Sequence, residues 1–166
     1  MNLVINRVNQ LCSDVDNSIS YLNWGGCAVF AAFMGQCLEA YGDVKIAIGS
    51  MNDVDSLDDV RENLEANVLQ CWNDAGVDFT HVIVEFSYNG VKYHIDSSGA
   101  HPPDIQTHVG QWSIPKGRLS VSEITALAAD GGWNKRFDRV QIPKMKKMFD
   151  DAFAHLFQQG LKPTIG

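Results

Sequence analysis

Two segments of alternating apolar and polar residues, THVIVEFSY at 80–88 and VKYHID at 91–96, are joined by Asn-Gly at 89–90. Asn-Gly between two alternating runs indicates a β-hairpin with a two-residue turn, because both central residues of that turn need positive φ angles. A two-residue turn pairs Tyr88 with Val91. That single pairing fixes the register of the whole hairpin.

The register divides the hairpin into a polar and an apolar face. Ile83 falls opposite Asp96, and His81, on the same face, falls diagonal to Asp96 at about 7 to 8 Å, within reach of an imidazole. A carboxylate beside a histidine holds the imidazole in one tautomer for proton transfer. The polar face carries His81, Ile83, Glu85, His94 and Asp96. The apolar face, which we expect in the core, carries Val82, Val84, Phe86, Tyr88, Val91, Tyr93 and Ile95.

The remaining segments carry patterns typical of helices and short strands. No repeat, low-complexity tract or linker divides the 166 residues, so we expect residues 1–166 to form a single domain. The order of elements predicts an α+β fold, with N-terminal and C-terminal helices packed on a small antiparallel sheet. The expected elements are helices at 2–12, at 27–41 before Gly42 and at 57–75, strands at 44–48 and within 105–114, a helix capped by Ser120 and Glu123, and a last helix opened by Pro143.

Among the four cysteines, Cys27 has the setting of a nucleophile. It follows a Gly-Gly pair and opens the apolar segment 27–41, so its sulfur is expected at the positive end of a helix dipole, which favours the thiolate. The preceding glycines allow a substrate to approach, and the Cys27 amide is a candidate donor to an oxyanion. Cys37 and Cys71 fall inside helical patterns and are predicted core thiols, and Cys12 ends the first expected helix.

Composition excludes several classes of function. The net charge is −7, and residues 1–91 hold three Lys/Arg against thirteen Asp/Glu, so we expect no nucleic-acid partner. The cysteines form no Cys-x-x-Cys pair, which favours a reducing compartment. The start of the chain lacks a secretory pattern, and the longest apolar run, at 28–34, is too short to span a bilayer. We therefore expect a cytoplasmic protein that does not enter a membrane.

Three pieces of the chain, NWGGCAVFAAF, HVIVEF and YHIDSSG, together resemble the transglutaminase-like branch of the papain-like cysteine proteases. The resemblance covers residues 23–99 and implies a papain-like fold in which the nucleophile opens a buried helix. It assigns Cys27 as the nucleophile, His81 as the base and Asp96 as the orienting acid. Ile83 stands where that family usually has an aromatic residue. The Gly-Gly-Cys order and the spacing of His81 and Asp96 also resemble the longer arylamine N-acetyltransferases.

The resemblance implies acyl transfer through a Cys27 acyl-enzyme, with a protein or peptide substrate and without a cofactor or metal. With water as the second nucleophile the chain is a peptidase or amidase. With an amine it is a transglutaminase or acyltransferase, and a non-catalytic protein-binding module on the same fold is a further alternative. Gly26 and Asn23 are the candidate oxyanion residues, with Trp24 behind them, and Trp112 is the candidate for a substrate groove.

Two other clusters carry alternative interpretations. His94, His101 and His108, with Asp104, contain the side-chain types of a zinc site but lack a tight ligand spacing such as His-Glu-x-x-His. The basic cluster of Lys135, Arg136, Arg139, Lys144, Lys146 and Lys147 is either a solvated face or a surface for an acidic partner. The acidic first part predicts, in addition, a preference for substrates that carry Lys or Arg.

Overall fold

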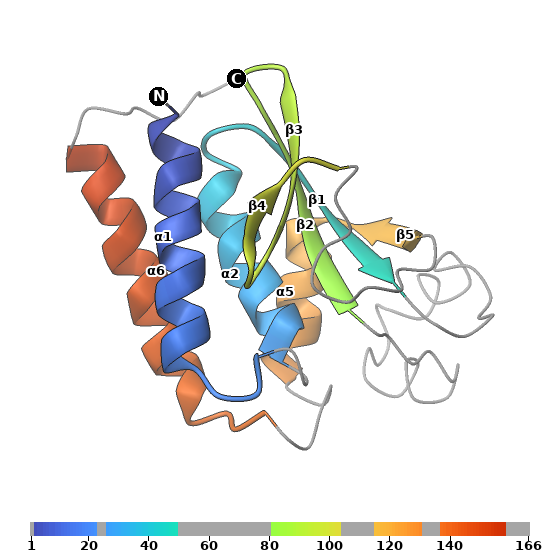
Figure 1. The fold of residues 1–166 in the computed structure, drawn as a ribbon. Coiled ribbons are helices and arrows are strands. Elements are labelled where there is room, and N and C mark those ends of the chain that lie inside the picture. Colours follow the sequence, from blue (N-terminus) through green and yellow to red (C-terminus); the bar gives the residue numbers. More distant parts are fainter. Residues whose placement is uncertain (1, 23–25, 50–80, 104–114, 131–136, 159–166) are drawn as a thin grey trace.

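The fold is α+β, with helices gathered on one side of a small antiparallel sheet (Figure 1). The computed structural model describes residues 2–22, 26–49, 81–103, 115–130 and 137–158. The elements are α1 (Leu3–Ser18), α2 (Cys27–Leu38), β1 (Asp43–Gly49), β2 (His81–Tyr88), β3 (Val91–Asp96), β4 (Gly99–His101), β5 (Pro115–Leu119), α5 (Val121–Asp130) and α6 (Gln141–Gln158). The helix predicted at 57–75 and the strand predicted within 105–114 lie outside the described residues.

The sheet has the strand order β4-β3-β2-β1-β5, and every neighbouring pair is antiparallel. The predicted hairpin register is confirmed, because pairing runs from Tyr88 with Val91 to Val84 with Ile95. The Asn-Gly turn has φ angles of 50° and 77°, as a two-residue turn of this kind requires. The short strands β4 and β5, at the two edges of the sheet, were not predicted.

One face of the sheet forms the core, as the alternation predicts for most of its members. Val82, Val84, Phe86 and Ile95 are buried, while Tyr88 and Tyr93 pack against the core from its margin. Val91 is the exception to the prediction, since it is 50% exposed. It directly follows the hairpin turn, where fewer neighbours remain to cover a side chain.

Helix α2 occupies the centre of the helical side and contacts β1, β2, α5 and α6. Its apolar side chains, including Phe30, Met34 and Leu38, are buried on nearly every side, which explains why the segment lacks a polar face. The helix ends at Leu38, three residues before the predicted end. The chain then turns into β1 at Gly42, where an added Cβ would collide with the main-chain carbonyl of Ser87.

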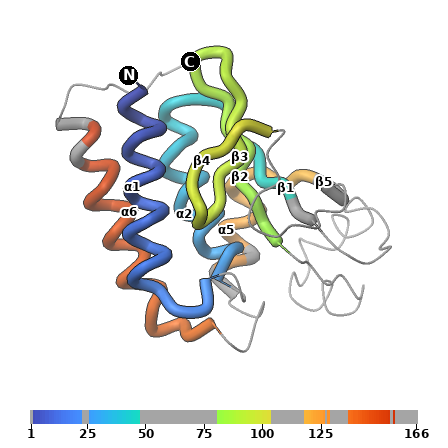
Figure 2. The backbone as a smooth tube through the Cα atoms, in the orientation of Figure 1, coloured from blue at the N-terminus to red at the C-terminus, as the bar shows by residue number. Residues whose placement is uncertain are grey.

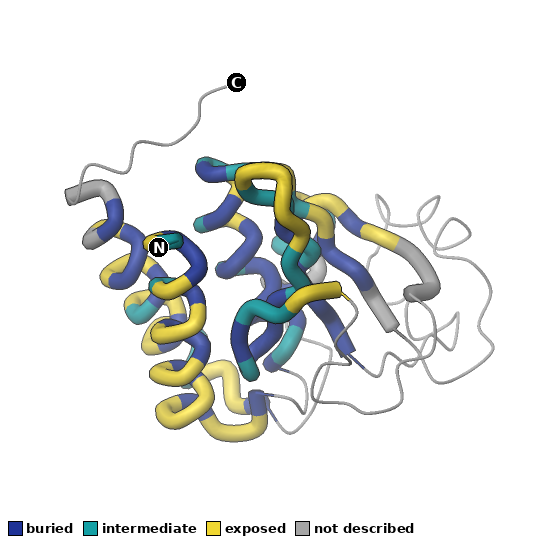
Figure 3. Tube along the Cα trace, turned by 45° about the horizontal axis from the view of Figure 1, so that its top comes forward, coloured by how far each residue is buried: buried dark blue, intermediate teal, exposed yellow. Residues whose placement is uncertain are grey.

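Helix α1 ends six residues later than predicted and runs beside α6 (Figure 2). The segment after Cys12 is mostly polar, but Val15 and Ile19 continue the buried stripe of Val8 and Leu11 at helical spacing. Figure 3 shows the result: both helices expose their outer faces and bury the faces turned toward the rest of the molecule.

The last two helices begin as the sequence signals indicate, within two residues. Ser120 and Glu123 form the predicted capping box, in which the Ser120 amide donates to the Glu123 carboxylate at 2.7 Å and the Glu123 amide donates to the Ser120 hydroxyl at 3.2 Å. Helix α6 begins at Gln141, so Pro143 lies in its first turn rather than at its first residue. Apolar residues recur at helical spacing along this helix from Met145 to Leu156, which predicts an apolar stripe. The stripe is buried at Met145, Phe149, Ala152, Phe153 and Leu156. Among the described residues, we find no helix with the length and apolar character needed to cross a bilayer.

Candidate active site

His81 and Asp96 form a buried hydrogen-bonded pair at one end of the hairpin. His81 is the first residue of β2 and Asp96 is the last residue of β3. Their side chains meet at 3.0 Å between Nε2 and Oδ2, and each is only 2% exposed. The diagonal placement predicted from the register therefore brings the two groups into direct contact.

Cys27, the first residue of α2, reaches the same histidine from the helical side of the sheet. Burial lowers the pKa of His81, but the neighbouring Asp96 carboxylate and Cys27 sulfur outweigh burial and raise it to about 9. Since Nε2 faces Asp96, Nδ1 is the ring nitrogen left to exchange a proton with Cys27. The surroundings of His81 therefore favour its protonated form, between Cys27 and Asp96.

Ser98 holds the second oxygen of the Asp96 carboxylate. Its main-chain amide and its hydroxyl both donate to Oδ1, at 2.8 and 2.5 Å. Burial raises the pKa of Asp96, while the hydrogen bonds from His81 and Ser98 lower it, and the net direction is downward. The carboxylate is thus ionised and has a donor at each oxygen.

The hydrogen-bonded chain continues beyond Ser98. The Ser98 hydroxyl lies 3.0 Å from Nε2 of His101 in β4. From α1, the Asn9 carbonyl oxygen accepts from the Ala100 amide at 2.7 Å and packs against Gly99, whose φ of +126° favours glycine. The sequence interpretation missed Ser98, His101 and Asn9 as members of this site.

A signal for one of these residues was present in the sequence. A serine two residues after an aspartate commonly bonds back to its carboxylate in a turn, and the Asp-Ser-Ser-Gly order predicts such a turn. No local sequence signal predicts that His101 or Asn9 belongs to this site, because both reach it through the tertiary packing of β4 and α1.

Two of the other cysteines have the properties of core thiols. Burial raises the pKa of Cys12, and the nearby charges of Asp96 and Asp16 raise it further. Burial also raises the pKa of Cys37, to about 12, with a further contribution from Asp150. Among the described residues, neither of these two thiols interacts with a histidine. Cys71 lies outside them.

The predicted oxyanion and groove residues are only partly described. Asn23, Trp24 and Trp112 lie outside the described residues. Gly26 is buried directly before α2, where an added Cβ would lie 2.7 Å from the Phe137 ring. Gly26 is the N-cap residue of α2, and because it has no side chain it makes no capping hydrogen bond to the main-chain amides of the first turn.

The histidines of the metal alternative have other partners. His94 and His101 face each other across β3 and β4, but His101 contacts Ser98, and His94 lies 3.7 Å from Glu85. His108 and Asp104 lie outside the described residues. In the part of the chain that the structure describes, no three His, Cys, Asp or Glu side chains are grouped to hold a metal ion.

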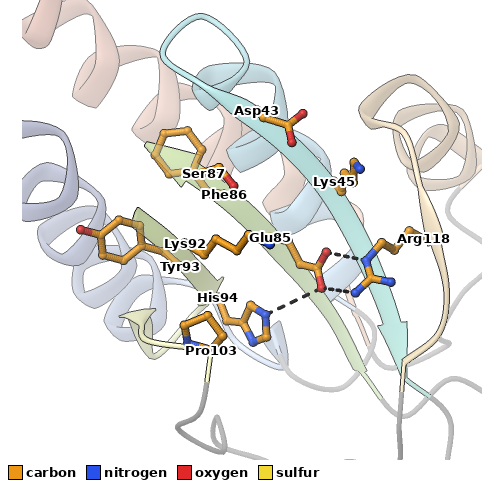
Figure 4. A pocket seen from close by; sticks show the side chains of 10 residues that line it. All are labelled: Asp43, Lys45, Glu85, Phe86, Ser87, Lys92, Tyr93, His94, Pro103 and Arg118. Atoms are coloured by element: carbon orange, nitrogen blue, oxygen red, sulfur yellow. Dashed lines mark hydrogen bonds and ion pairs between the residues drawn. The ribbon is translucent and has the colours of Figure 1, made fainter. Parts of the chain in front are cut away.

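A second feature, a pocket of about 470 Å³, lies on the polar face of the sheet (Figure 4). Glu85 crosses it and accepts two hydrogen bonds from Arg118, at 2.6 and 2.9 Å. Ile83 and Ala47, on the same face between this pocket and His81, are buried. The pocket is therefore separate from the Cys27 site. Its lining is Asp43, Lys45, Glu85, Phe86, Ser87, Lys92, Tyr93, His94, Pro103 and Arg118.

Comparison with known proteins gives no relative of this chain: no family model, no curated protein and no solved structure matches it.

Proposed function

We propose that this chain is a cysteine-dependent hydrolase of a peptide, isopeptide or amide bond, built on a papain-like, transglutaminase-like architecture. The observation that carries the proposal is the meeting of Cys27, His81 and Asp96, each from a different element, with His81 buried between the other two. A thiol, an imidazole and an ionised carboxylate in that order are the parts of an activated nucleophile.

The first step is attack by the Cys27 thiolate on the carbonyl carbon of the substrate, forming a carbon–sulfur bond. The His81 imidazolium then gives its proton to the leaving amine as the carbon–nitrogen bond breaks, which leaves a thioester on Cys27. Neutral His81 next takes a proton from water, and the resulting hydroxide equivalent attacks the thioester. The carbon–sulfur bond then breaks, which releases the carboxylic acid and restores the Cys27 thiolate beside protonated His81. Asp96 keeps the imidazole oriented throughout, through its 3.0 Å contact with Nε2.

The oxyanion formed in both attacks needs nearby donors. The start of α2 supplies main-chain amides next to the nucleophile, at the positive end of a helix dipole. We propose the Cys27 amide as the first donor and Asn23 as the second. Gly26 seats the start of α2 against the Phe137 ring rather than leaving space for a substrate, which is a correction to the expectation from sequence. Trp24 and Trp112 are the proposed aromatic walls for a peptide substrate.

Acyl transfer to an amine uses the same first half of the reaction. It differs only in the group that attacks the thioester, so transglutaminase or acyltransferase activity is the alternative on the same residues. A binding module without catalysis is the remaining alternative, and it does not require an imidazolium held next to a thiol.

Alkylation of the cysteines tests the proposal. At pH 6 an ordinary thiol is almost wholly protonated, whereas a thiol beside an imidazolium reacts as the thiolate. We expect iodoacetamide, with adducts mapped by mass spectrometry, to modify Cys27 about 10- to 100-fold faster than Cys12 or Cys37. The advantage should disappear in H81A, and in H81Q, which keeps more of the buried volume.

Circular dichroism and thermal melting of both variants serve as the control that they are folded. Equal rates at Cys27 and Cys37 in the wild-type protein would contradict the proposal. So would a folded H81Q variant in which Cys27 keeps its advantage.

A further inference from the structure

In the hydrogen bonds beyond Asp96, the ionised state of the carboxylate determines which group donates and which accepts. An ionised carboxylate only accepts, so the Ser98 hydroxyl donates its one proton to Asp96 Oδ1. That hydroxyl has no proton left for His101, and the 3.0 Å contact between them must therefore be donated by His101 Nε2. His101 is held in a form that carries a proton on Nε2, and the bonds run from His101 to Ser98 to Asp96.

This chain of bonds clamps the carboxylate at both ends. Oδ1 receives two bonds from Ser98, and Oδ2 receives one from His81. Rotation of the carboxylate would break bonds at both oxygens, and water does not replace them easily because Asp96 is 2% exposed. The orientation of Asp96 toward His81 thus depends on Ser98.

The backbone that carries Ser98 and His101 is itself fixed by pairing. Asp96 pairs with Gly99, so the chain reverses direction over Ser97 and Ser98 alone. The positive φ of Gly99 permits the reversal, and Asn9 anchors the following amide from α1. His101, two residues further along β4, is partly exposed and is the outermost member of the chain.

From these contacts we infer that Ser98 and His101 are positioning residues, which hold the Asp96 carboxylate toward His81 and so act on Cys27 through two intermediates. The inference rests on the proposed function, since it assigns a role in the Cys27 site. Removal of the hydroxyl leaves, among the described residues, the Ser98 amide as the donor to Oδ1. Removal of the His101 donor leaves the hydroxyl free to rotate away from Asp96.

The test is a set of variants read at His81 and Cys27. We expect S98A and H101F to move the NMR titration of His81 to lower pH and to slow Cys27 alkylation at pH 6 about three- to tenfold. S98T keeps the hydroxyl and H101Q keeps a side-chain N–H donor, so both should recover at least half of the loss. H94Q is the matched control, because His94 pairs with His101 in the sheet but lies outside the chain of bonds.

The outcomes separate this inference from the proposed function. If Cys27 of the wild-type protein reacts no faster than Cys37, the proposed function fails and the inference fails with it. If Cys27 is fast and S98A and H101F stay within twofold of wild type, with an unchanged His81 titration, only the inference is overturned. A lower melting temperature without a change in either readout would show a structural role and would also overturn it.

Discussion

His81 is the residue at which the opposing forces of this site meet. Burial favours its neutral form, while Asp96, in direct contact at 3.0 Å, and Cys27 favour the imidazolium and together outweigh burial. The pKa of about 9 makes His81 an acid for most of the physiological range. That suits a group that must first protonate a leaving amine.

The raised pKa predicts how stability depends on pH. An unfolded histidine titrates near 6.5, so the stabilisation from charged His81 is complete below about pH 6.5 and is lost as pH rises through about 9. We expect the difference in the free energy of unfolding between wild type and H81Q to be largest at pH 6 and to shrink by pH 9.5. Urea unfolding at pH 6, 7.5 and 9.5 measures it. A difference that is constant, or that grows with pH, would contradict the assigned pKa.

The sequence predicted the core of the site better than its surroundings. His81 and Asp96 could be placed together because a two-residue turn leaves one register, which propagates the length of both strands. Ser98 was missed, although its spacing to Asp96 predicts a hydrogen bond to that carboxylate. His101 was considered as a candidate zinc ligand and not as a member of this site, because the pairing of a three-residue edge strand depends on β3 rather than on its own residues.

Gly26, directly before α2, determines how the helix that carries Cys27 packs against the rest of the molecule. Its φ of −81° is open to any residue, so the backbone does not require glycine. The requirement comes from Phe137, which precedes α6 and packs its ring where a Cβ would lie. The start of α2 and the approach to α6 are therefore fitted to each other at this glycine.

G26A tests this packing. Alanine lowers the entropy of the unfolded chain, which stabilises by about 0.4 to 1 kcal/mol, but overpacking costs about 1 to 3 kcal/mol, and at 2.7 Å from the ring the second effect should prevail. We expect a net loss of about 1 to 2 kcal/mol in urea unfolding. In an F137L background, which removes the ring, the same substitution should cost less than half as much. An equal cost in both backgrounds would exclude the Phe137 contact as the cause.

The elements that the sequence predicted well are those whose signals are local. The Asn-Gly turn, the Ser120 and Glu123 capping box and the apolar stripe of α6 each depend on neighbours within one or two turns of chain. The end of α1 was set too early because its second half is mostly polar, although Val15 and Ile19 are buried. β5 was missed because Pro115 and Gly117 are poor strand formers, and pairing with β1 overrides that preference.

At the scale of the molecule, charge bears on what the protein can bind. The described lysines of the basic cluster are largely engaged: Lys146 and Lys147 pair with Asp150 and Asp151 one turn along α6, and Lys144 donates to the Ser18 carbonyl. These contacts fit the interpretation of a solvated face, with pairs that contribute little to stability. Eight of the thirteen acids in residues 1–91 fall within 50–80, outside the described residues. The preference for Lys- or Arg-containing substrates therefore stays a prediction.

In the proposed function, Cys27, His81 and Asp96 act as one unit in acyl transfer. Acylation with p-nitrophenyl acetate at pH 7, followed by mass spectrometry, tests it most directly, because the reagent needs no knowledge of the natural substrate. We predict an acetyl group on Cys27 that disappears with time by hydrolysis, and acylation at least about tenfold slower in folded D96A. Acetylation spread equally over Cys12, Cys27 and Cys37, or a D96A variant that acylates Cys27 as fast as wild type, would contradict the account.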